Sequence, residues 1–179
     1  RAQTGRVATP IRVVSIETPV RRRFGETFDG NQLERVVAFA KQREISLHLD
    51  GARIFLQAAY ENRPVSDYTA PFDTVYVSLY KYFNAPSGAI LAGPRSLLDG
   101  MFHTRRMFGA GLPAAWPFAA IAHHYLPGFT TRFRRAVDTS EAWVELISNH
   151  DAFVVERIKS GTNLLRLRVT GTDPQLFRA

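Results

Sequence analysis

The sequence predicts an α/β fold with a mostly parallel sheet, followed by the start of a small α+β domain. Segments rich in β-branched residues alternate with segments whose apolar residues recur at helical spacing, and this alternation is typical of βα units. Parallel strands need such helical crossovers, because the chain must return to the same edge of the sheet before each new strand. With 45% hydrophobic and 12% aromatic residues, the 179-residue chain has enough apolar material to bury a core.

The expected elements follow in chain order. Strands are predicted at residues 11–16, 46–50, 74–80 and 89–92, and helices at residues 31–44, 54–62 and 96–108. Asp29 or Asn31 can cap the first helix, and Gly109 ends the third. A longer helical stretch, interrupted by prolines, runs from residue 114 toward residue 147.

The C-terminal part of the chain has a different pattern. Residues 153–158 and 164–169 alternate apolar with charged side chains, as half-exposed antiparallel strands do. We therefore expect the large domain over residues 1–126, and a connecting helix with the beginning of the small domain over residues 127–179. The chain has no initiator methionine and stops after a predicted strand and turn, so we expect it to be a piece of a longer protein.

The composition makes several partner classes unexpected. The net charge of +7 comes from basic residues spread along the chain, with few clusters beyond Arg21–Arg23, so no nucleic-acid partner is expected. No segment has the uninterrupted apolar length that a bilayer crossing needs, and no membrane partner is expected.

Cysteine is absent, which removes disulfides and thiolate metal ligands. This absence is compatible with a cytoplasmic location, which we expect. His123 and His124 are adjacent, so on a helix they point about 100° apart, and we expect no metal site.

Two polar segments directly follow predicted strands. Asp50 ends the strand of residues 46–50, and Lys81 follows the strand of residues 74–80. In an open α/β sheet ligands bind at the carboxyl ends of the strands, so these two side chains are expected to converge there. His48 lies two residues before Asp50 and therefore on the same face of its strand. Taken alone, an Asp-Gly pair after a strand is most often a turn, and Lys81 would be a solvated loop residue.

A carboxylate, an arginine and a lysine at one sheet edge fit what pyridoxal 5'-phosphate requires. The amine of Lys81 can condense with the cofactor aldehyde, while Asp50 keeps the pyridine nitrogen protonated so that the ring accepts electrons. Arg53, beyond a glycine turn, can reach an anionic group of the cofactor or the substrate. Ser78 can bond the phosphate, with a plain strand hydroxyl as the alternative. His48 is expected to support Asp50 structurally rather than to transfer protons.

The surrounding residues make this pattern more specific. The run His-Leu-Asp-Gly-Ala-Arg ends at Arg53, Lys81 follows Asp50 by 31 positions (81 minus 50), and Ala-Pro-Ser-Gly-Ala-Ile-Leu-Ala-Gly begins at Ala85. Together these residues resemble the threonine aldolases and related β-eliminating lyases, which are fold-type-I enzymes that use pyridoxal phosphate. The resemblance spans most of the chain and implies an aspartate-aminotransferase-like large domain. It also implies that Lys81 forms the Schiff base, that Asp50 partners the pyridine nitrogen, and that Arg53 contacts cofactor and substrate.

The chain departs from the family's pattern at two places. The residue before the lysine is Tyr80 where the family usually has serine, and a segment that usually reads Gly-Gly-Gly-Met-Arg-Gln is Gly-Ala-Gly-Leu-Pro-Ala at residues 109–114. Tyr80 and Tyr82, together with Pro113 in place of a polar arginine, are therefore expected to make the surroundings of the substrate side chain larger or more aromatic. The alternative is that both tyrosines face the core or a subunit contact.

The resemblance implies a definite reaction and assembly. It implies a lyase that cleaves the Cα–Cβ bond of a threonine-type β-hydroxy-α-amino acid to glycine and an aldehyde, in a homodimer or homotetramer. Two alternatives stay open: β-elimination by the same Lys81, Asp50 and Arg53, and a catalytically inactive binding protein of fold type I. The family's phosphate-binding loop and ring-stacking residue would lie outside this segment.

Overall fold

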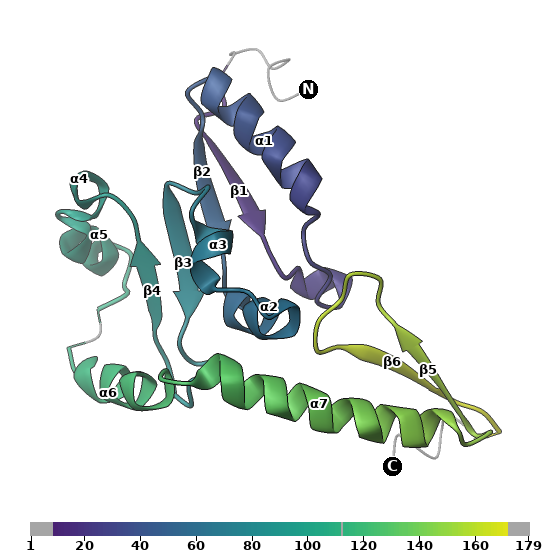
Figure 1. The fold of residues 1–179 in the computed structure, drawn as a ribbon. Helices are drawn as coiled ribbons and strands as arrows, with labels where there is room; N and C mark the ends of the chain where they lie inside the picture. Colours follow the sequence, from purple (N-terminus) through teal and green to yellow (C-terminus); the bar gives the residue numbers. More distant parts are fainter. Residues whose placement is uncertain (1–8, 112, 172–179) are drawn as a thin grey trace.

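The main sheet of the molecule has four strands. The computed structural model describes residues 9–111 and 113–171, and its strands are β1 (Val13–Glu17), β2 (Ser46–Asp50), β3 (Thr74–Ser78) and β4 (Ala89–Ala92), neighbours in that order (Figure 1). β1, β2 and β3 are parallel, whereas β4 pairs antiparallel with β3. The predicted α/β fold with a mostly parallel sheet is confirmed, and the direction of β4 is a further finding.

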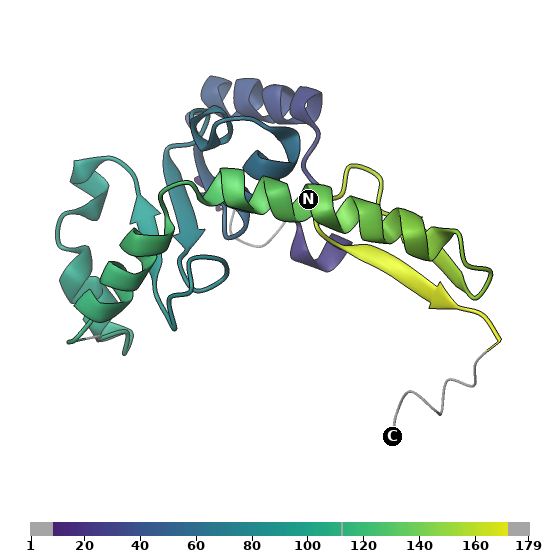
Figure 2. The same ribbon diagram turned by 60° about the horizontal axis from the view of Figure 1, so that its bottom comes forward.

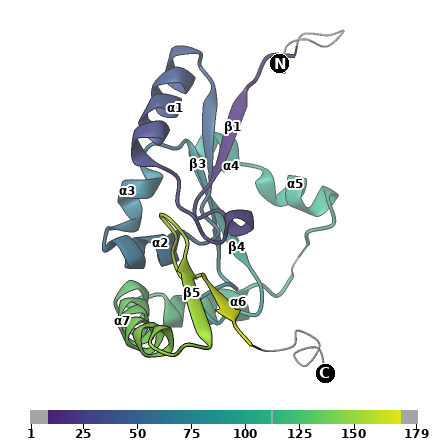
Figure 3. The same cartoon turned by 90° about the vertical axis from the view of Figure 1, so that its right-hand side faces the viewer.

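Three helices cover one face of this sheet. They are α1 (Gly30–Gln42), α2 (Ile54–Glu61) and α3 (Val65–Thr69), and Figure 3 shows all three on the same side of the strands. Asp29 caps α1, because its carboxylate accepts a hydrogen bond from the Gln32 N–H at 2.9 Å. The strands bury Ile16, Leu47 and Leu49 on this face, and their alternate residues point the other way.

The segment after β4 forms shorter helices. These are α4 (Arg95–Leu98), α5 (Met101–Met107) and α6 (Trp116–Tyr125). The prediction of a single helix over residues 96–108 is wrong, because the chain turns between α4 and α5 at Gly100, whose φ of +81° lies in the left-handed region. Figure 3 places α5 on the side of the sheet away from α1.

A long helix and a hairpin complete the described chain. They are α7 (Phe129–Ser148), β5 (Phe153–Arg157) and β6 (Leu165–Val169), and the two strands pair antiparallel as predicted. The first half of α7 packs on α2, where Arg134 Nη1 donates to the carbonyl oxygen of Tyr60 at 2.9 Å. Figure 2 shows α7 extending from this contact to the hairpin. None of the helices in the described ranges combines the length and apolarity that a bilayer crossing requires.

The loop between β5 and β6 returns to the N-terminal part of the chain. The N–H of Thr27 donates to the carbonyl oxygen of Ser160 at 2.8 Å, and Thr162 Oγ1 donates to that of Gly25 at 3.1 Å. The hairpin therefore rests against the loop that follows β1. The division into a large domain over residues 1–126 and a small one over residues 127–179 stays a prediction, and residues 1–8, 112 and 172–179 lie outside the described part.

Candidate functional site

Two rows of side chains cross the sheet on the face away from α1 and α2. The strand register gives the rows Ser15, His48, Thr74 and Glu17, Asp50, Tyr76. Side chains two residues apart on one strand point to the same face, and in a parallel sheet registered neighbours share that face. The two rows therefore form a continuous polar surface that ends at the carboxyl edge of β1, β2 and β3.

A cavity of about 520 Å³ opens on this surface. Four residues predicted from the sequence line it: His48, Asp50, Arg53 and Lys81. The fifth, Ser78, ends β3 beneath the cavity and is fully buried. The structure thus brings all five predicted site residues to one place, as expected for the carboxyl edge of an open α/β sheet.

The cavity also contains residues that sequence reasoning did not single out for the site. Glu17, Arg21 and Tyr76 line it as well. Glu17 and Tyr76 are the register partners of Asp50, so their place in the cavity follows from the alignment of three strands, for which the sequence gives no signal. Arg21 belongs to a short 3-10 helix (Arg21–Arg23), and its N–H donates to Glu17 Oε1 at 3.0 Å.

The turn after β2 holds Asp50 in the cavity. Oδ1 of Asp50 accepts a hydrogen bond from the Ala52 N–H at 3.1 Å, and the Gly51 N–H donates to the carbonyl oxygen of Tyr76 at 2.9 Å. A Cβ atom at Gly51 would lie 3.0 Å from that carbonyl oxygen, so the close approach of the two chains favours glycine. The carboxylate therefore stabilises the turn and also reaches the cavity.

His48 links two strands one row below Asp50. Its Nδ1 atom shares a 2.8 Å hydrogen bond with Thr74 Oγ1 on β3. Since Thr74 is the register partner of His48, this bond runs directly across the sheet. The imidazole is thereby oriented by β3 while its ring lines the cavity.

Lys81 is held by a chain of hydrogen bonds. Its Nζ donates to Ser78 Oγ at 2.8 Å, and Ser78 Oγ donates to Tyr76 Oη at 3.1 Å. Nζ also lies 4.9 Å from the ring centroid of Tyr80, within the range of a cation–π interaction. The Ser78 hydroxyl therefore accepts one hydrogen bond and donates another. Its expected contact with a phosphate stays a prediction.

The two tyrosines beside Lys81 have opposite environments. Tyr80 is half exposed in the cavity wall. Its pKa is lowered because Lys81 and, after it, Ser78 are hydrogen-bond donors that favour its phenolate, and because Lys81 is positively charged. Tyr82 is turned into the protein, where burial raises its pKa and its hydroxyl has no hydrogen-bond partner among the described residues. Of the two tyrosines expected near a substrate side chain, Tyr80 lines the cavity and Tyr82 faces the core.

An aromatic cluster anchors the loop that carries Lys81. Phe83 is 1% exposed, and its ring packs edge-on against Phe55 and Phe129 at centroid distances of 4.9 and 5.1 Å. Tyr82 packs edge-on against Phe83 at 4.6 Å. Because Phe55 lies on α2 and Phe129 begins α7, two helices fix the chain directly after the lysine.

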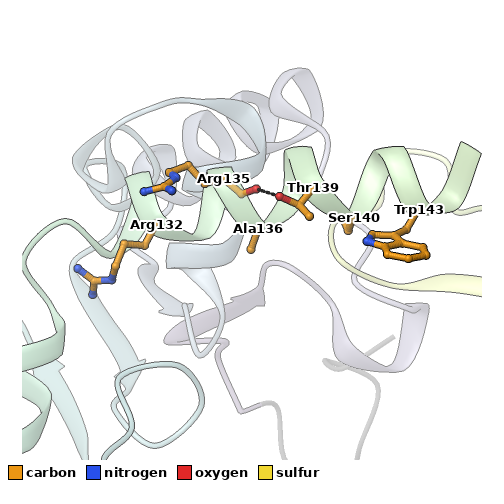
Figure 4. A pocket seen from close by; sticks show the side chains of 6 residues that line it. All are labelled: Arg132, Arg135, Ala136, Thr139, Ser140 and Trp143. Atoms are coloured by element: carbon orange, nitrogen blue, oxygen red, sulfur yellow. Dashed lines mark hydrogen bonds between the residues drawn. The ribbon is translucent and has the colours of Figure 1, made fainter.

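A second hollow, of about 470 Å³, lies along α7 (Figure 4). Its lining residues are Arg132, Arg135, Ala136, Thr139, Ser140 and Trp143. All six come from one helix, and Thr139 Oγ1 donates back to the carbonyl oxygen of Arg135 at 2.9 Å. The lining offers no carboxylate or lysine, in contrast to the cavity at the sheet edge.

Known proteins match this chain over most of its length. Residues 2–170 match the β-eliminating lyase family. The chain is 23% identical to a low-specificity L-threonine aldolase of Candida albicans over 167 residues, which are 93% of this chain and 44% of that protein. It therefore spans less than half the length of this relative.

Solved structures share the fold. A protein from Listeria monocytogenes, provisionally assigned as an L-allo-threonine aldolase, matches with a TM-score of 0.72 and 27% identity over 84% of this chain and 42% of that one. A protein from Exiguobacterium, provisionally assigned as an aromatic amino acid β-eliminating lyase or threonine aldolase, matches with a TM-score of 0.74 and 26% identity over 86% of this chain and 43% of that one. The fold-type-I architecture is thereby confirmed, and the chain belongs to the β-eliminating lyase family.

Proposed function

We propose that this chain supplies the pyridoxal-phosphate half-site of a lyase that cleaves the Cα–Cβ bond of a β-hydroxy-α-amino acid to glycine and an aldehyde. The observation that carries the proposal is the convergence of Asp50, Arg53 and Lys81, from the ends of two neighbouring strands, on one cavity. Membership of the β-eliminating lyase family supports lyase chemistry, and the threonine aldolase among the relatives supports the substrate class.

The donor set of the cavity fits this cofactor. Nζ of Lys81 is a nucleophile for an aldehyde, Asp50 is an anionic partner for a protonated ring nitrogen, and Arg21 and Arg53 are cations for anionic groups. When bound, pyridoxal phosphate supplies an electron sink for the electron pair released at Cα.

Each residue of the half-site has a separate task. Asp50 would keep a proton on the ring nitrogen, because its negative charge favours the protonated form. Arg53 orients a carboxylate, since a guanidinium binds both oxygens of such a group. Lys81 would hold the cofactor through its amine and, when released, could take up or give a proton at the substrate. His48 is oriented by its hydrogen bond with Thr74, and Ser78 orients Lys81 by accepting a hydrogen bond from its amine.

The rest of the site comes from outside this chain. The chain spans less than half of its aldolase relative, and the family's phosphate-binding loop and ring-stacking residue are not among the described residues that line the cavity. We propose that further residues of the protein and of a neighbouring subunit complete the site in a homodimer or homotetramer.

Covalent labelling tests the half-site directly. The chain contains three lysines, Lys41, Lys81 and Lys159, so borohydride reduction in the presence of pyridoxal phosphate should attach the cofactor to Lys81 and leave the other two as internal references. Lys81→Met should remove the label, while the matched control Lys159→Met should keep it. Labelling that persists in Lys81→Met would overturn the assignment.

The reaction is tested separately in the protein as a whole. Aldehyde release from threonine, allo-threonine and phenylserine is expected, and pyruvate release from serine should be absent or slower. Pyruvate without aldehyde would replace the proposed carbon–carbon cleavage by β-elimination.

A further inference from the structure

We propose that Ser78 and Tyr76 form a hydroxyl relay that positions Lys81 and carries a proton between its amine and an aldehyde oxygen in the cavity. The inference rests on the proposed function for the identity of that aldehyde, whereas the relay itself is a property of this chain. In this proposal Ser78 acts on the amine of Lys81, and Tyr76 has a role that the sequence did not suggest.

The relay is continuous from the amine to the cavity. Lys81 Nζ donates to Ser78 Oγ at 2.8 Å, and Ser78 Oγ donates in turn to Tyr76 Oη at 3.1 Å. Both ends, Lys81 and Tyr76, line the same cavity, while the middle member is fully buried. A proton can therefore leave the lysine through protein groups and re-enter the cavity at the phenol.

Burial of the middle member keeps the relay intact. Ser78 is 0% exposed, so its hydroxyl must find protein partners, and losing them would leave a buried polar group unpaired. Its backbone is fixed by antiparallel pairing with Ala89 on β4. The loop after Lys81 is fixed by Phe83, so both ends of the Ser78–Lys81 bond belong to rigid parts of the fold.

Strand register sets where the relay ends. Tyr76 is the partner of Asp50 across β2 and β3, so the phenol enters the cavity beside the carboxylate proposed to face the cofactor ring. Tyr80 directly precedes Lys81 in the sequence. Its ring centroid lies 4.9 Å from Lys81 Nζ, and its side chain is half exposed. Of the two phenols, Tyr76 is the one whose oxygen accepts the Ser78 hydroxyl hydrogen bond, at 3.1 Å.

Proton balance shows what the relay does. When the neutral amine of Lys81 attacks an aldehyde carbon, the N–C bond forms and the carbonyl electron pair moves to oxygen. One proton passes from Nζ to Ser78 Oγ, the Ser78 hydroxyl proton passes to Tyr76 Oη, and the phenolic proton of Tyr76 passes to the new alkoxide. Each relay residue ends with the number of protons it had at the start, and no external acid or base is consumed in this addition. The C–O bond of the adduct then breaks, the hydroxyl leaves as water with the remaining Nζ proton, and the resulting imine is the species that borohydride reduces.

A small aldehyde tests the relay without the cofactor. The folded chain is mixed rapidly with acetaldehyde, quenched with borohydride at increasing times, and the ethyl label on Lys81 and Lys159 is measured by peptide mass spectrometry. Ser78→Ala and Tyr76→Phe should each lower the initial rate at Lys81 by about 100-fold or more, the lower end of general acid–base effects. The rate at Lys159 should not change.

Tyr82→Phe is the matched control. It removes a hydroxyl one residue from Lys81 that faces the core and belongs to no hydrogen-bonded chain among the described residues. The Lys81 rate should therefore be that of the wild type. Tyr76→Phe keeps the ring and the strand, so a lost rate in that variant cannot be ascribed to unfolding if its unfolding midpoint is unchanged.

Chemical rescue separates proton transfer from mere packing. Imidazole buffer of increasing concentration should restore the Lys81 rate in Ser78→Ala and Tyr76→Phe, because a soluble shuttle replaces the missing hydroxyls. It should have little effect on the wild type. Slow variants that imidazole does not rescue would overturn the relay, as would variants with wild-type rates.

The same variants distinguish this inference from the proposed function. If pyridoxal phosphate labels Lys81 in the wild type and equally fast in Ser78→Ala and Tyr76→Phe, the relay fails and the half-site stands. If pyridoxal phosphate labels none of the lysines while acetaldehyde labels Lys81 with the expected dependence, the proposed function fails and the relay stands.

Discussion

Asp50 and Tyr76 are direct partners across the parallel strands β2 and β3, and the turn after Asp50 is bonded to the carbonyl oxygen of Tyr76. A carboxylate and a phenol therefore enter the cavity side by side from two adjacent strands. Backbone hydrogen bonds fix this pairing, so substitutions that keep the Asp50 oxygen that accepts the Ala52 N–H can alter one side chain while the strand pairing stays in place.

Asp50→Asn should leave cofactor attachment to Lys81 intact and lower turnover by orders of magnitude. A neutral amide cannot hold the ring-nitrogen proton, while its oxygen can still accept the Ala52 N–H and keep the turn. The measurements are kcat in the whole protein and borohydride labelling of Lys81. Unchanged turnover would mean that Asp50 is only a turn residue.

Lys81→Met should raise the pKa of Tyr80 toward the ordinary tyrosine value of 10.0. In the wild type the pKa is lowered by hydrogen bonding from Lys81 and Ser78 and by the positive charge of Lys81, all of which favour the phenolate. Removing the amine therefore moves the titration to higher pH. The phenolate absorbance of each protein is compared with that of its Tyr80→Phe counterpart, which isolates Tyr80. A titration that stays in place or moves to lower pH contradicts the assigned cause.

Phe83→Ala should reduce the free energy of unfolding by about 3–5 kcal/mol, because it leaves a cavity in the aromatic cluster under the lysine loop. Phe102→Ala is the control: this ring is 57% exposed on α5, and its removal should change the free energy by less than about 0.5 kcal/mol. Urea denaturation measures both. Equal effects in the two variants would show that the cluster does not anchor the loop.

Tyr82→Phe and Tyr68→Phe should change stability in opposite directions. The Tyr82 hydroxyl is buried without a partner among the described residues, so its removal should raise the free energy of unfolding by about 1 kcal/mol. The Tyr68 hydroxyl donates to Glu61 Oε2 at 2.8 Å, so its removal should lower that free energy by about 1 kcal/mol. Denaturant midpoints give the comparison, and a destabilised Tyr82→Phe would point to a hydrogen bond that the structure lacks.

Local patterns predicted the elements that carry the site. The strand at residues 46–50 has the predicted bounds, because alternating side chains lie between a helix end and an Asp-Gly turn. The short helix α3 was not predicted, since five residues give too little periodicity to recognise. Residues 96–108 look like one helix in sequence, and only the backbone angle at Gly100 divides them.

The pairing of strands that are distant in the sequence limits how much of the cavity could be predicted. Lys81, Asp50 and Arg53 could be predicted because each follows a strand at a recognisable motif. Glu17 and Tyr76 could not, because their place in the cavity depends on how β1 and β3 are aligned against β2, and the sequence of one strand does not specify that alignment. The sequence likewise does not show which of Tyr80 and Tyr82 packs into the aromatic cluster. In the structure it is Tyr82, whose ring contacts Phe83.

Two hydrogen bonds, one between Thr162 and Gly25 and one between Thr27 and Ser160, determine how this protein can be shortened. Gly25 follows the 3-10 helix that brings Arg21 to the cavity, so the hairpin loop braces one wall of the site from far away in the sequence. A truncation after α7 would keep the lysine and the aspartate but release this wall. Minimal versions of the half-site therefore have to retain the C-terminal hairpin.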